Sequence, residues 1–282
     1  MKNVLKTIKE LNRKRVADRR NDKFKTTLSN SFDRHILEIS SLNKLVSSKT
    51  VSSNPFAKEL AIYSTYFGSI TNKTFNANRV AAGLDHYFIS NNKDILSDVT
   101  KAGWIPIFLN LEISTNRVLS AQQAKIPKAL PHLFPELTAY QFLFYVDDKI
   151  DFDVSTLQSL REMMSKNNSS LMVRAHPSLH GNILNEFAAA MIQPRYQAQR
   201  DQTVEYIDSK LHEGLTLKVK HLYWTSAILR NMAHPETVGI NEDWYANILE
   251  CGIECQISFD FIAQKYSSIA VMPDVISRAS NI

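Results

Sequence analysis

One short apolar run, residues 140–146, constrains the fold of this chain more than any other stretch. The run is rich in aromatic side chains and too short for a separate helix, so it predicts a buried β-strand. Asp147, Asp148 and Lys149 follow it directly. Ligands of open α/β sheets bind just beyond the carboxyl ends of the strands. The stretch therefore predicts either a binding site at this end of a sheet or a plain polar turn.

Other segments extend this strand into an α/β domain. Strands separated by helical stretches are typical of a mostly parallel sheet that helices cover on both faces. We expect this domain to span residues 55–282. Apolar segments predict further strands at residues 60–66, 85–90, 104–109, 170–174, 221–230 and 268–272. Periodic segments predict helices at residues 117–130, broken or kinked at Pro127, at 154–165 with Asp153 as the cap, and at 182–192, 197–211, 242–250 and 255–266.

Residues 1–54 differ in composition and predict a basic, helical appendage with a serine-rich linker at 46–54. Residues 1–25 hold ten basic and three acidic residues, a net charge of +7, whereas the whole chain carries +5. A basic arm of this kind suits a polyanion, either nucleic acid or anionic lipid. The alternative is a solvated helix that docks through its apolar face.

The chain has two cysteines, Cys251 and Cys255, too few for a disulfide scaffold and without the partners that a structural zinc site needs. This usage favours a reducing compartment. The amino terminus lacks the apolar segment of a signal peptide, and no apolar run is long enough to cross a membrane. We therefore expect a cytoplasmic protein.

Two groups of residues suit a nucleotide and its phosphates. Gly68 and Ser69 form a small-residue loop that can admit a base or ribose, although a plain turn fits the pattern too. Lys125 and Lys128 lie three apart on one helical face, so their ammonium groups can neutralise a diphosphate, unless both are simply solvated. Asp147, with phosphate oxygens and waters, is sufficient to hold Mg²⁺ or Mn²⁺.

A histidine follows the expected strand at 170–174. His176 comes two residues after Arg174, and Glu186 lies ten residues beyond it. A histidine at a strand end can act as a general base or bind a sugar hydroxyl. The alternative is a structural histidine that only makes hydrogen bonds.

The order of these clusters resembles the hexosyltransferase-like glycosyltransferases of GT-A type, a family with plant cell-wall, bacterial and phage members. The resemblance covers about residues 58–275, and its order and spacing carry it rather than any single motif. One position departs from the family pattern: Cys255 stands where the family has Asp before Gln-x-Ser-Phe. The matching positions are Lys125, Lys128, Pro131-His132, Asp147-Asp148-Lys149, His176, Glu186, Tyr206, Glu213-Gly214-Leu215, Arg230, Trp244 and Gln256.

The resemblance implies a GT-A-like, Rossmann-type sheet and an enzyme that transfers a sugar from a nucleoside-diphosphate sugar to a hydroxyl acceptor. It implies Mn²⁺ or Mg²⁺ on Asp147. The residues that it implies for catalysis are His176, Glu186 and Asp148. Together with the clusters described above, it leads us to expect donor binding by Gly68, Ser69, Lys125, Lys128, Lys149, Arg174 and Gln256.

Two acceptors and one rival function remain open. The basic arm favours DNA carrying a hydroxymethylated cytosine, as in phage enzymes, which would place the protein in the host cytoplasm. The competing acceptor is a surface-glycan precursor made at the cytosolic membrane face, where the arm would contact anionic lipid. The rival function is a non-catalytic nucleic-acid-binding protein, favoured by the +7 arm and by the departure at Cys255.

Overall fold

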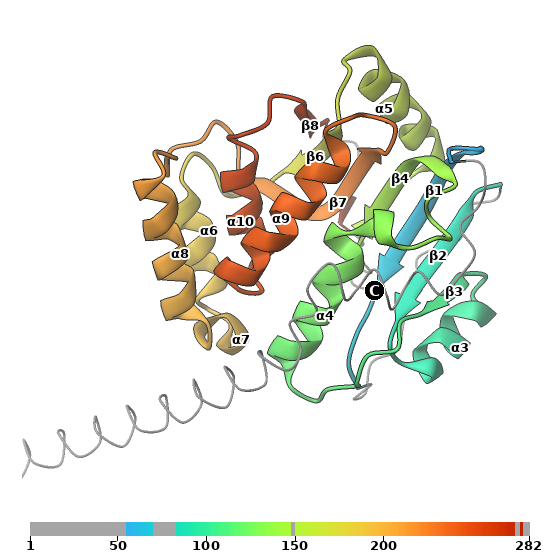
Figure 1. Ribbon diagram of the computed structural model, residues 1–282, viewed down its shortest axis with the longest axis horizontal. Coiled ribbons are helices and arrows are strands. Elements are labelled where there is room, and N and C mark those ends of the chain that lie inside the picture. Colours follow the sequence, from blue (N-terminus) through green and yellow to red (C-terminus); the bar gives the residue numbers. More distant parts are fainter. Residues whose placement is uncertain (1–54, 70–82, 148–149, 274–276, 279–282) are drawn as a thin grey trace, which may run out of the picture. The chain divides into compact units, whose positions relative to one another are not determined.

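The computed structural model describes residues 55–69, 83–147, 150–273 and 277–278. The expected basic arm and its linker lie outside these ranges, as do Asp148 and Lys149. Within them, the central feature is a seven-stranded sheet in the order β3-β2-β1-β4-β7-β6-β8 (Figure 1). Its middle strand, β4 (Tyr140–Val146), is the buried strand that the apolar run predicts.

The sheet is mostly parallel, as predicted. β1 pairs in parallel with β2 and β4, β2 with β3, and β6 with β8, whereas β7 runs antiparallel to both β4 and β6. The carboxyl ends of β1, β2, β4 and β6 therefore meet the amino end of β7 at one edge. The remaining strand bounds are β1 (Lys58–Thr65), β2 (Asp85–Ser90), β3 (Ile105–Phe108), β6 (Leu171–Ala175), β7 (Tyr223–Asn231) and β8 (Ile269–Met272).

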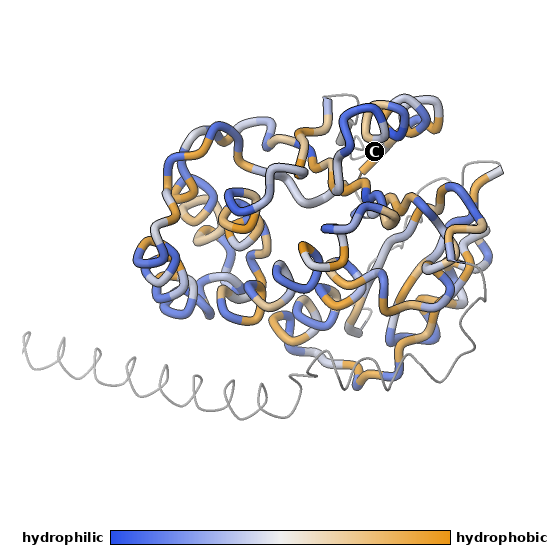
Figure 2. The backbone as a smooth tube through the Cα atoms, turned by 45° about the horizontal axis from the view of Figure 1, so that its top comes forward, coloured by the Kyte–Doolittle hydropathy of each residue, from blue (hydrophilic) through white to orange (hydrophobic). Residues whose placement is uncertain are grey.

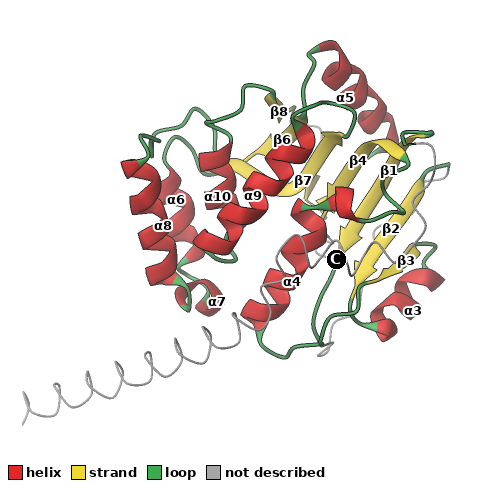
Figure 3. Ribbon diagram, in the orientation of Figure 1, coloured by secondary structure: helices red, strands yellow, loops and turns green. Residues whose placement is uncertain are grey.

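Helices cover both faces of the sheet, which confirms the α/β class (Figure 3). One face packs an apolar cluster against α3 and α5, while α4 and α10 contact β1 and β7 on the other. Figure 2 shows hydrophobic and hydrophilic stretches alternating along the helices, as expected when one side of each is buried. The helices are α3 (Lys93–Lys101), α4 (Arg117–Ala129), η1 (Pro131–Leu133), α5 (Val154–Lys166), α6 (Ile183–Ala190), α7 (Pro194–Gln197), α8 (Arg200–His212), α9 (Thr237–Cys251) and α10 (Cys255–Ile262).

Several element boundaries differ from the predictions. α4 continues through Pro127 and ends at Ala129, so the proline does not end the helix. α9 begins at Thr237, before the predicted residue 242, and α10 ends at Ile262, before the predicted residue 266. α5 begins as predicted, because the Asp153 side chain accepts a hydrogen bond from the Ser155 amide.

Several features were not predicted, among them the short helices η1 and α7. α3 follows β2 directly, capped by the Asn92 side chain. A second, two-stranded antiparallel sheet pairs β5 (Ile150–Asp151) with β9 (Ser277–Arg278), and strands this short leave no periodic signal in the sequence. Among the helices within the described ranges, none has both the length and the apolar character of a membrane span.

Candidate active site

The polar residues predicted to form a site gather at the edge where β1, β4 and β6 end. Gly68 follows β1, Asp147 follows β4, and His176 follows β6. The amino end of the antiparallel β7 adds Trp224 and Thr225 to the same edge. The parallel topology, rather than closeness in sequence, therefore brings these side chains together.

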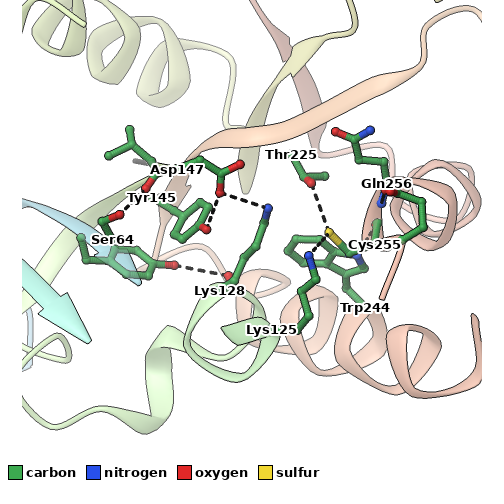
Figure 4. Close-up of polar contacts among 12 residues, drawn as sticks. Ser64, Lys125, Lys128, Tyr145, Asp147, Thr225, Trp244, Cys255 and Gln256 are labelled. Carbon is green, nitrogen blue, oxygen red and sulfur yellow. Dashed lines mark hydrogen bonds and ion pairs between the residues drawn. The ribbon is translucent and has the colours of Figure 1, made fainter. Parts of the chain in front are cut away.

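Asp147 is held in place by its backbone and by its neighbour on β4. Its amide donates to the carbonyl oxygen of Ser226 at 2.8 Å. Its Oδ1 accepts a hydrogen bond from the Tyr145 hydroxyl at 2.6 Å and lies 3.6 Å from the Lys128 ammonium (Figure 4). The Asp147 side chain is 26% exposed, so this pair reaches solvent although the strand is buried.

Lys128 is a buried lysine, not a solvated one. Its side chain is only 6% exposed, and its ammonium lies 4.9 Å from the centroid of the Tyr145 ring. Burial lowers the pKa of Lys128, and the charge of Asp147 opposes that shift. Because the Lys128 side chain is enclosed, it can adopt few rotamers. Its ammonium group lies at the carboxyl end of β4.

Arg230 fixes the end of the helix that carries Lys128. Its fully buried guanidinium donates to the Lys128 carbonyl oxygen at 2.7 Å, to the Tyr63 hydroxyl at 2.9 Å and to Asn241 Oδ1 at 2.9 Å. These bonds tie α4 to β1 and α9. The sequence showed an arginine at the end of an apolar strand, but not that it positions Lys128.

Lys125 lies one turn before Lys128 and points to a different partner. Its ammonium lies 3.1 Å from Cys255 Sγ, and Figure 4 shows both lysine side chains rising from α4. Burial by itself would lower the pKa of Lys125. The nearby Cys255 and Glu254 act in the opposite direction and more strongly, so the pKa is raised. We call Lys125, Lys128, Asp147 and Cys255 the basic cluster.

Cys255 is held between the basic cluster and the helices behind it. Its Sγ lies 3.4 Å from the Thr225 hydroxyl, and its carbonyl oxygen accepts a hydrogen bond from the Trp244 indole at 3.1 Å. Both contacts fix the first turn of α10 against β7 and α9. These contacts therefore also fix the position of the next residue, Gln256.

Gln256 leads to a second group of titratable side chains. Its side-chain amide donates to Glu186 Oε1 at 2.5 Å. Glu186 is buried, and its Oε2 makes no hydrogen bond within the described part of the chain. Burial, helped by the charge of Glu254, raises the pKa of Glu186 to about 7. A carboxyl that titrates near neutral pH can accept a proton and give it up again.

Two more buried carboxyls surround Glu186. Glu254 caps α10 and accepts from the Gln256 amide at 3.1 Å, while Asp260 Oδ1 accepts from the Tyr223 amide at 2.8 Å. Burial raises the pKa of Asp260, and the charges of Glu186 and Glu254 add to this shift. We call Glu186, Glu254, Gln256 and Asp260 the acidic cluster.

The Nε2 nitrogen of His176 faces the acidic cluster. Its Nδ1 accepts the backbone amides of Leu179 at 2.9 Å and Ser178 at 3.2 Å, so a neutral ring carries its proton on Nε2. Nε2 lies 3.8 Å from Glu186 Oε2. Burial, His180 and Arg174 lower the pKa of His176, so we read this contact as a neutral imidazole beside a titrating carboxyl, not as a fixed ion pair.

Arg174 lies beside His176 and not beside the lysines. Its guanidinium stacks 5.0 Å from the centroid of the Trp224 ring, and its charge acts on His176. Of the two residues predicted to bind the donor on this side, Gln256 belongs to the acidic cluster and Arg174 lies beside His176. Their predicted role stays a prediction.

Gly68 and Ser69 form a separate part of the edge. Gly68 has φ of +114°, and a Cβ there would lie 2.8 Å from the Ser120 hydroxyl of α4, so only glycine fits. Its amide donates to Asn91 Oδ1 at 3.3 Å. Ser69 is half-buried. The loop packs on the amino-terminal half of α4, and its predicted contact with a base or ribose stays a prediction.

The described residues fit a divalent cation at Asp147 poorly. Oδ1 of this carboxylate already accepts the Tyr145 hydroxyl and faces the Lys128 ammonium. A cation on the carboxylate would face that ammonium at short range, a repulsion on the order of several kcal/mol at an effective dielectric constant of about 20. Within the described ranges, no three His, Cys, Asp or Glu side chains gather to hold a metal ion. The arrangement suits an ammonium at Asp147, and the expected Mn²⁺ or Mg²⁺ finds no support in it.

Comparison with models of known protein families finds no match, and comparison with curated proteins finds none either. The chain is similar in structure to mouse xyloside xylosyltransferase 1 in its apo form, at 9% sequence identity and a TM-score of 0.40, over 76% of this chain and 85% of that one. It is also similar to the apo structure of the WbbM bifunctional glycosyltransferase, at 10% identity and a TM-score of 0.44, over 79% of this chain and 40% of that one. At this degree of similarity, neither comparison assigns an activity to the chain.

Proposed function

We propose that this protein is a glycosyltransferase that moves a sugar from a nucleoside-diphosphate sugar to a hydroxyl acceptor. One observation carries the proposal. Two consecutive residues of α10 join the two clusters, because Cys255 contacts Lys125 and Gln256 contacts Glu186. Cationic groups suited to a diphosphate therefore lie close to a carboxyl suited to a proton from an acceptor.

The basic cluster supplies the leaving-group chemistry. When the bond between the sugar's anomeric carbon and the diphosphate oxygen breaks, the electron pair stays on that oxygen. Lys125 and Lys128 offset the negative charge that grows there, which is electrostatic stabilisation of the transition state. Asp147 orients Lys128 through their contact of 3.6 Å. The lysines act in a partly buried site, where such interactions are stronger than in water.

The acidic cluster supplies the proton acceptor. As the acceptor oxygen forms its bond to the anomeric carbon, its hydroxyl proton passes to Glu186. The side-chain amide of Gln256 holds Oε1, which leaves Oε2 for that proton. His176 then acts as a hydrogen-bond donor to the acceptor or to Glu186, and the roles predicted for Asp148 and Lys149 lie outside the described residues.

The sequence resemblance supports the same assignment. Among its matching positions, Lys125, Lys128, Asp147, His176 and Glu186 fall in or against the two clusters. These positions are spread over 62 residues of the chain, from 125 to 186, yet they come together at one edge of the sheet. A surface turn with solvated lysines would not produce such a grouping.

The acceptor is proposed from the amino-terminal charge alone. We propose DNA with a hydroxymethylated base as the first acceptor to test, because the +7 of residues 1–25 suits a polyanion. A surface-glycan precursor is the second. Incubation of the protein with mixed nucleotide sugars and either acceptor, followed by mass spectrometry, identifies the modified molecule by the added mass of one sugar.

Sugar transfer itself is tested first without an acceptor. A panel of nucleotide sugars is incubated with the full chain, and release of nucleoside diphosphate is followed by chromatography. We expect slow release with at least one donor, and loss of that release in Lys125→Gln and Lys128→Gln. The matched control is Lys101→Gln, an exposed lysine of α3 paired with Asp98 at 3.0 Å. If no donor is hydrolysed and no nucleoside diphosphate binds, the proposed function is wrong.

A further inference from the structure

Lys128 occupies the position at the end of β4 where a cation was expected. Its ammonium lies 3.6 Å from Asp147 Oδ1 and above the Tyr145 ring. The carbonyl oxygen of Lys128 accepts hydrogen bonds from Arg230 and Tyr63, at 2.7 and 3.4 Å, so the helix end behind the ammonium is fixed. The positive charge at this carboxylate is therefore built into the chain.

Lys125 adds a second ammonium group beside that of Lys128. It projects from the same helix one turn earlier, and the two ammonium groups are close enough for Lys125 to lower the pKa of Lys128. Its partner is the Cys255 thiol at 3.1 Å. Cys255 and Glu254 raise the pKa of Lys125 against the effect of burial, which favours its charged ammonium form. Two ammonium groups together carry the formal charge of one divalent cation.

We propose that Lys125 and Lys128 together take the place of a divalent cation, so that the protein binds and releases its nucleoside diphosphate without a metal ion. This inference rests on the proposed function. The diphosphate leaves with the electron pair of the broken bond, and both lysines remain protonated throughout. Asp147 serves as the anchor of Lys128.

The test is calorimetric titration of the full chain with uridine diphosphate and, separately, guanosine diphosphate, once in EDTA and once in Mn²⁺. The account predicts that at least one of them binds with the same Kd, within about threefold, in both buffers. Lys128→Gln weakens binding in EDTA at least about tenfold, the loss of roughly one charge-assisted hydrogen bond. Lys101→Gln binds like the unmodified protein.

A further measurement on Lys128→Gln and one additional variant extend the test. Lys128→Gln removes the ammonium from Asp147, so added Mn²⁺ recovers part of the lost affinity. Cys255→Asp places a carboxylate beside Lys125 and weakens binding in EDTA. Thermal melts show whether each variant is folded, and the comparison of EDTA with Mn²⁺ in the unmodified protein needs no variant.

The outcomes separate this inference from the proposed function. Binding that appears only with Mn²⁺ overturns metal-free binding and leaves the glycosyltransferase proposal intact. If neither diphosphate binds in either buffer, the titration is repeated with adenosine, cytidine and thymidine diphosphates, and absence of binding by all five overturns the glycosyltransferase proposal itself.

Discussion

Burial decides what each charged residue at the sheet edge can do. Glu186 and Lys128 are 5% exposed each, yet one is a carboxyl whose pKa is raised to about 7 and the other an ammonium paired with Asp147. Sequence spacing identified both residues as candidates. It did not reveal that Nδ1 of His176 accepts two backbone amides, which is why we propose Glu186 rather than His176 as the proton acceptor.

The pH dependence of turnover follows from Glu186. If Glu186 is the proton acceptor, as proposed, its carboxylate form is the active one, so donor turnover should rise with pH and level off above its pKa of about 7. Glu186→Gln should lower sugar transfer by about 100-fold or more and abolish the inflection near neutral pH. Initial rates of transfer between pH 5 and 9 measure both effects. The control is Glu162→Gln, an exposed residue of α5, which should keep the inflection.

Stability should change with pH in the opposite direction. Folding favours the protonated Glu186, because its pKa is raised above the ordinary value of 4.5. The resulting stability is fully present below pH 4.5 and is lost as the pH rises through about 7. The melting temperature of Glu186→Gln should therefore fall less between pH 5 and 8 than that of the unmodified protein. An equal fall in both proteins would show that Glu186 has an ordinary pKa.

At the scale of elements, the junction between α9 and α10 aims the two residues that join the clusters. Gly252 ends α9 with φ of 103°, and a Cβ there would lie 3.0 Å from Gln199 Oε1. The same Gln199 oxygen accepts the Ile253 amide at 2.8 Å. This glycine therefore sets where α10 begins, and with it the positions of Cys255 and Gln256.

Gly252→Ala should destabilise the protein by about 1–3 kcal/mol, from backbone strain and from the displaced Gln199, and should also lower donor turnover. Urea denaturation measures the first effect and diphosphate release the second. Gly214→Ala is the matched control, because Gly214 also has a positive φ, +87°, but an added Cβ meets nothing within 4 Å. It should lose some stability and keep its turnover. Equal turnover in the two variants would contradict the role of the junction.

The elements that sequence predicted well are those with a strong local signal. β4 matches its apolar run at both ends, and α5 begins at its Asp153 cap. α3 was missed although the sequence carries a local signal for it: the Asn92 side chain caps the helix, and Ile95, Leu96 and Val99 form its buried side. The role of Arg230 was missed for a different reason: its bond to the Lys128 carbonyl joins residues 102 positions apart.

At the scale of the whole molecule, the basic residues 1–25 and the described domain have separable tasks in the DNA model. Deleting residues 1–25 removes a net charge of +7. If the acceptor is DNA, the deletion should weaken DNA binding and make it less dependent on salt, because fewer counterions are released. Fluorescence anisotropy with labelled duplex DNA between about 50 and 200 mM salt measures both changes.

The same deletion should leave donor hydrolysis unchanged, because the clusters belong to the described domain. Unchanged DNA affinity would exclude residues 1–25 as a DNA contact and favour the glycan acceptor. DNA binding that survives Asp147→Ala, without sugar transfer under any condition, would instead favour a non-catalytic nucleic-acid-binding protein.

The proposed stabilisation of a departing diphosphate by Lys125 and Lys128 can be measured by comparing two leaving groups. Hydrolysis is measured for a nucleotide sugar and for the dinitrophenyl glycoside of the same sugar, whose leaving group spreads its charge over a ring. The Lys125→Gln, Lys128→Gln double variant should lose about 100-fold or more on the nucleotide sugar and only a few-fold on the glycoside. Equal losses on both substrates, or none on the nucleotide sugar, would contradict the claim.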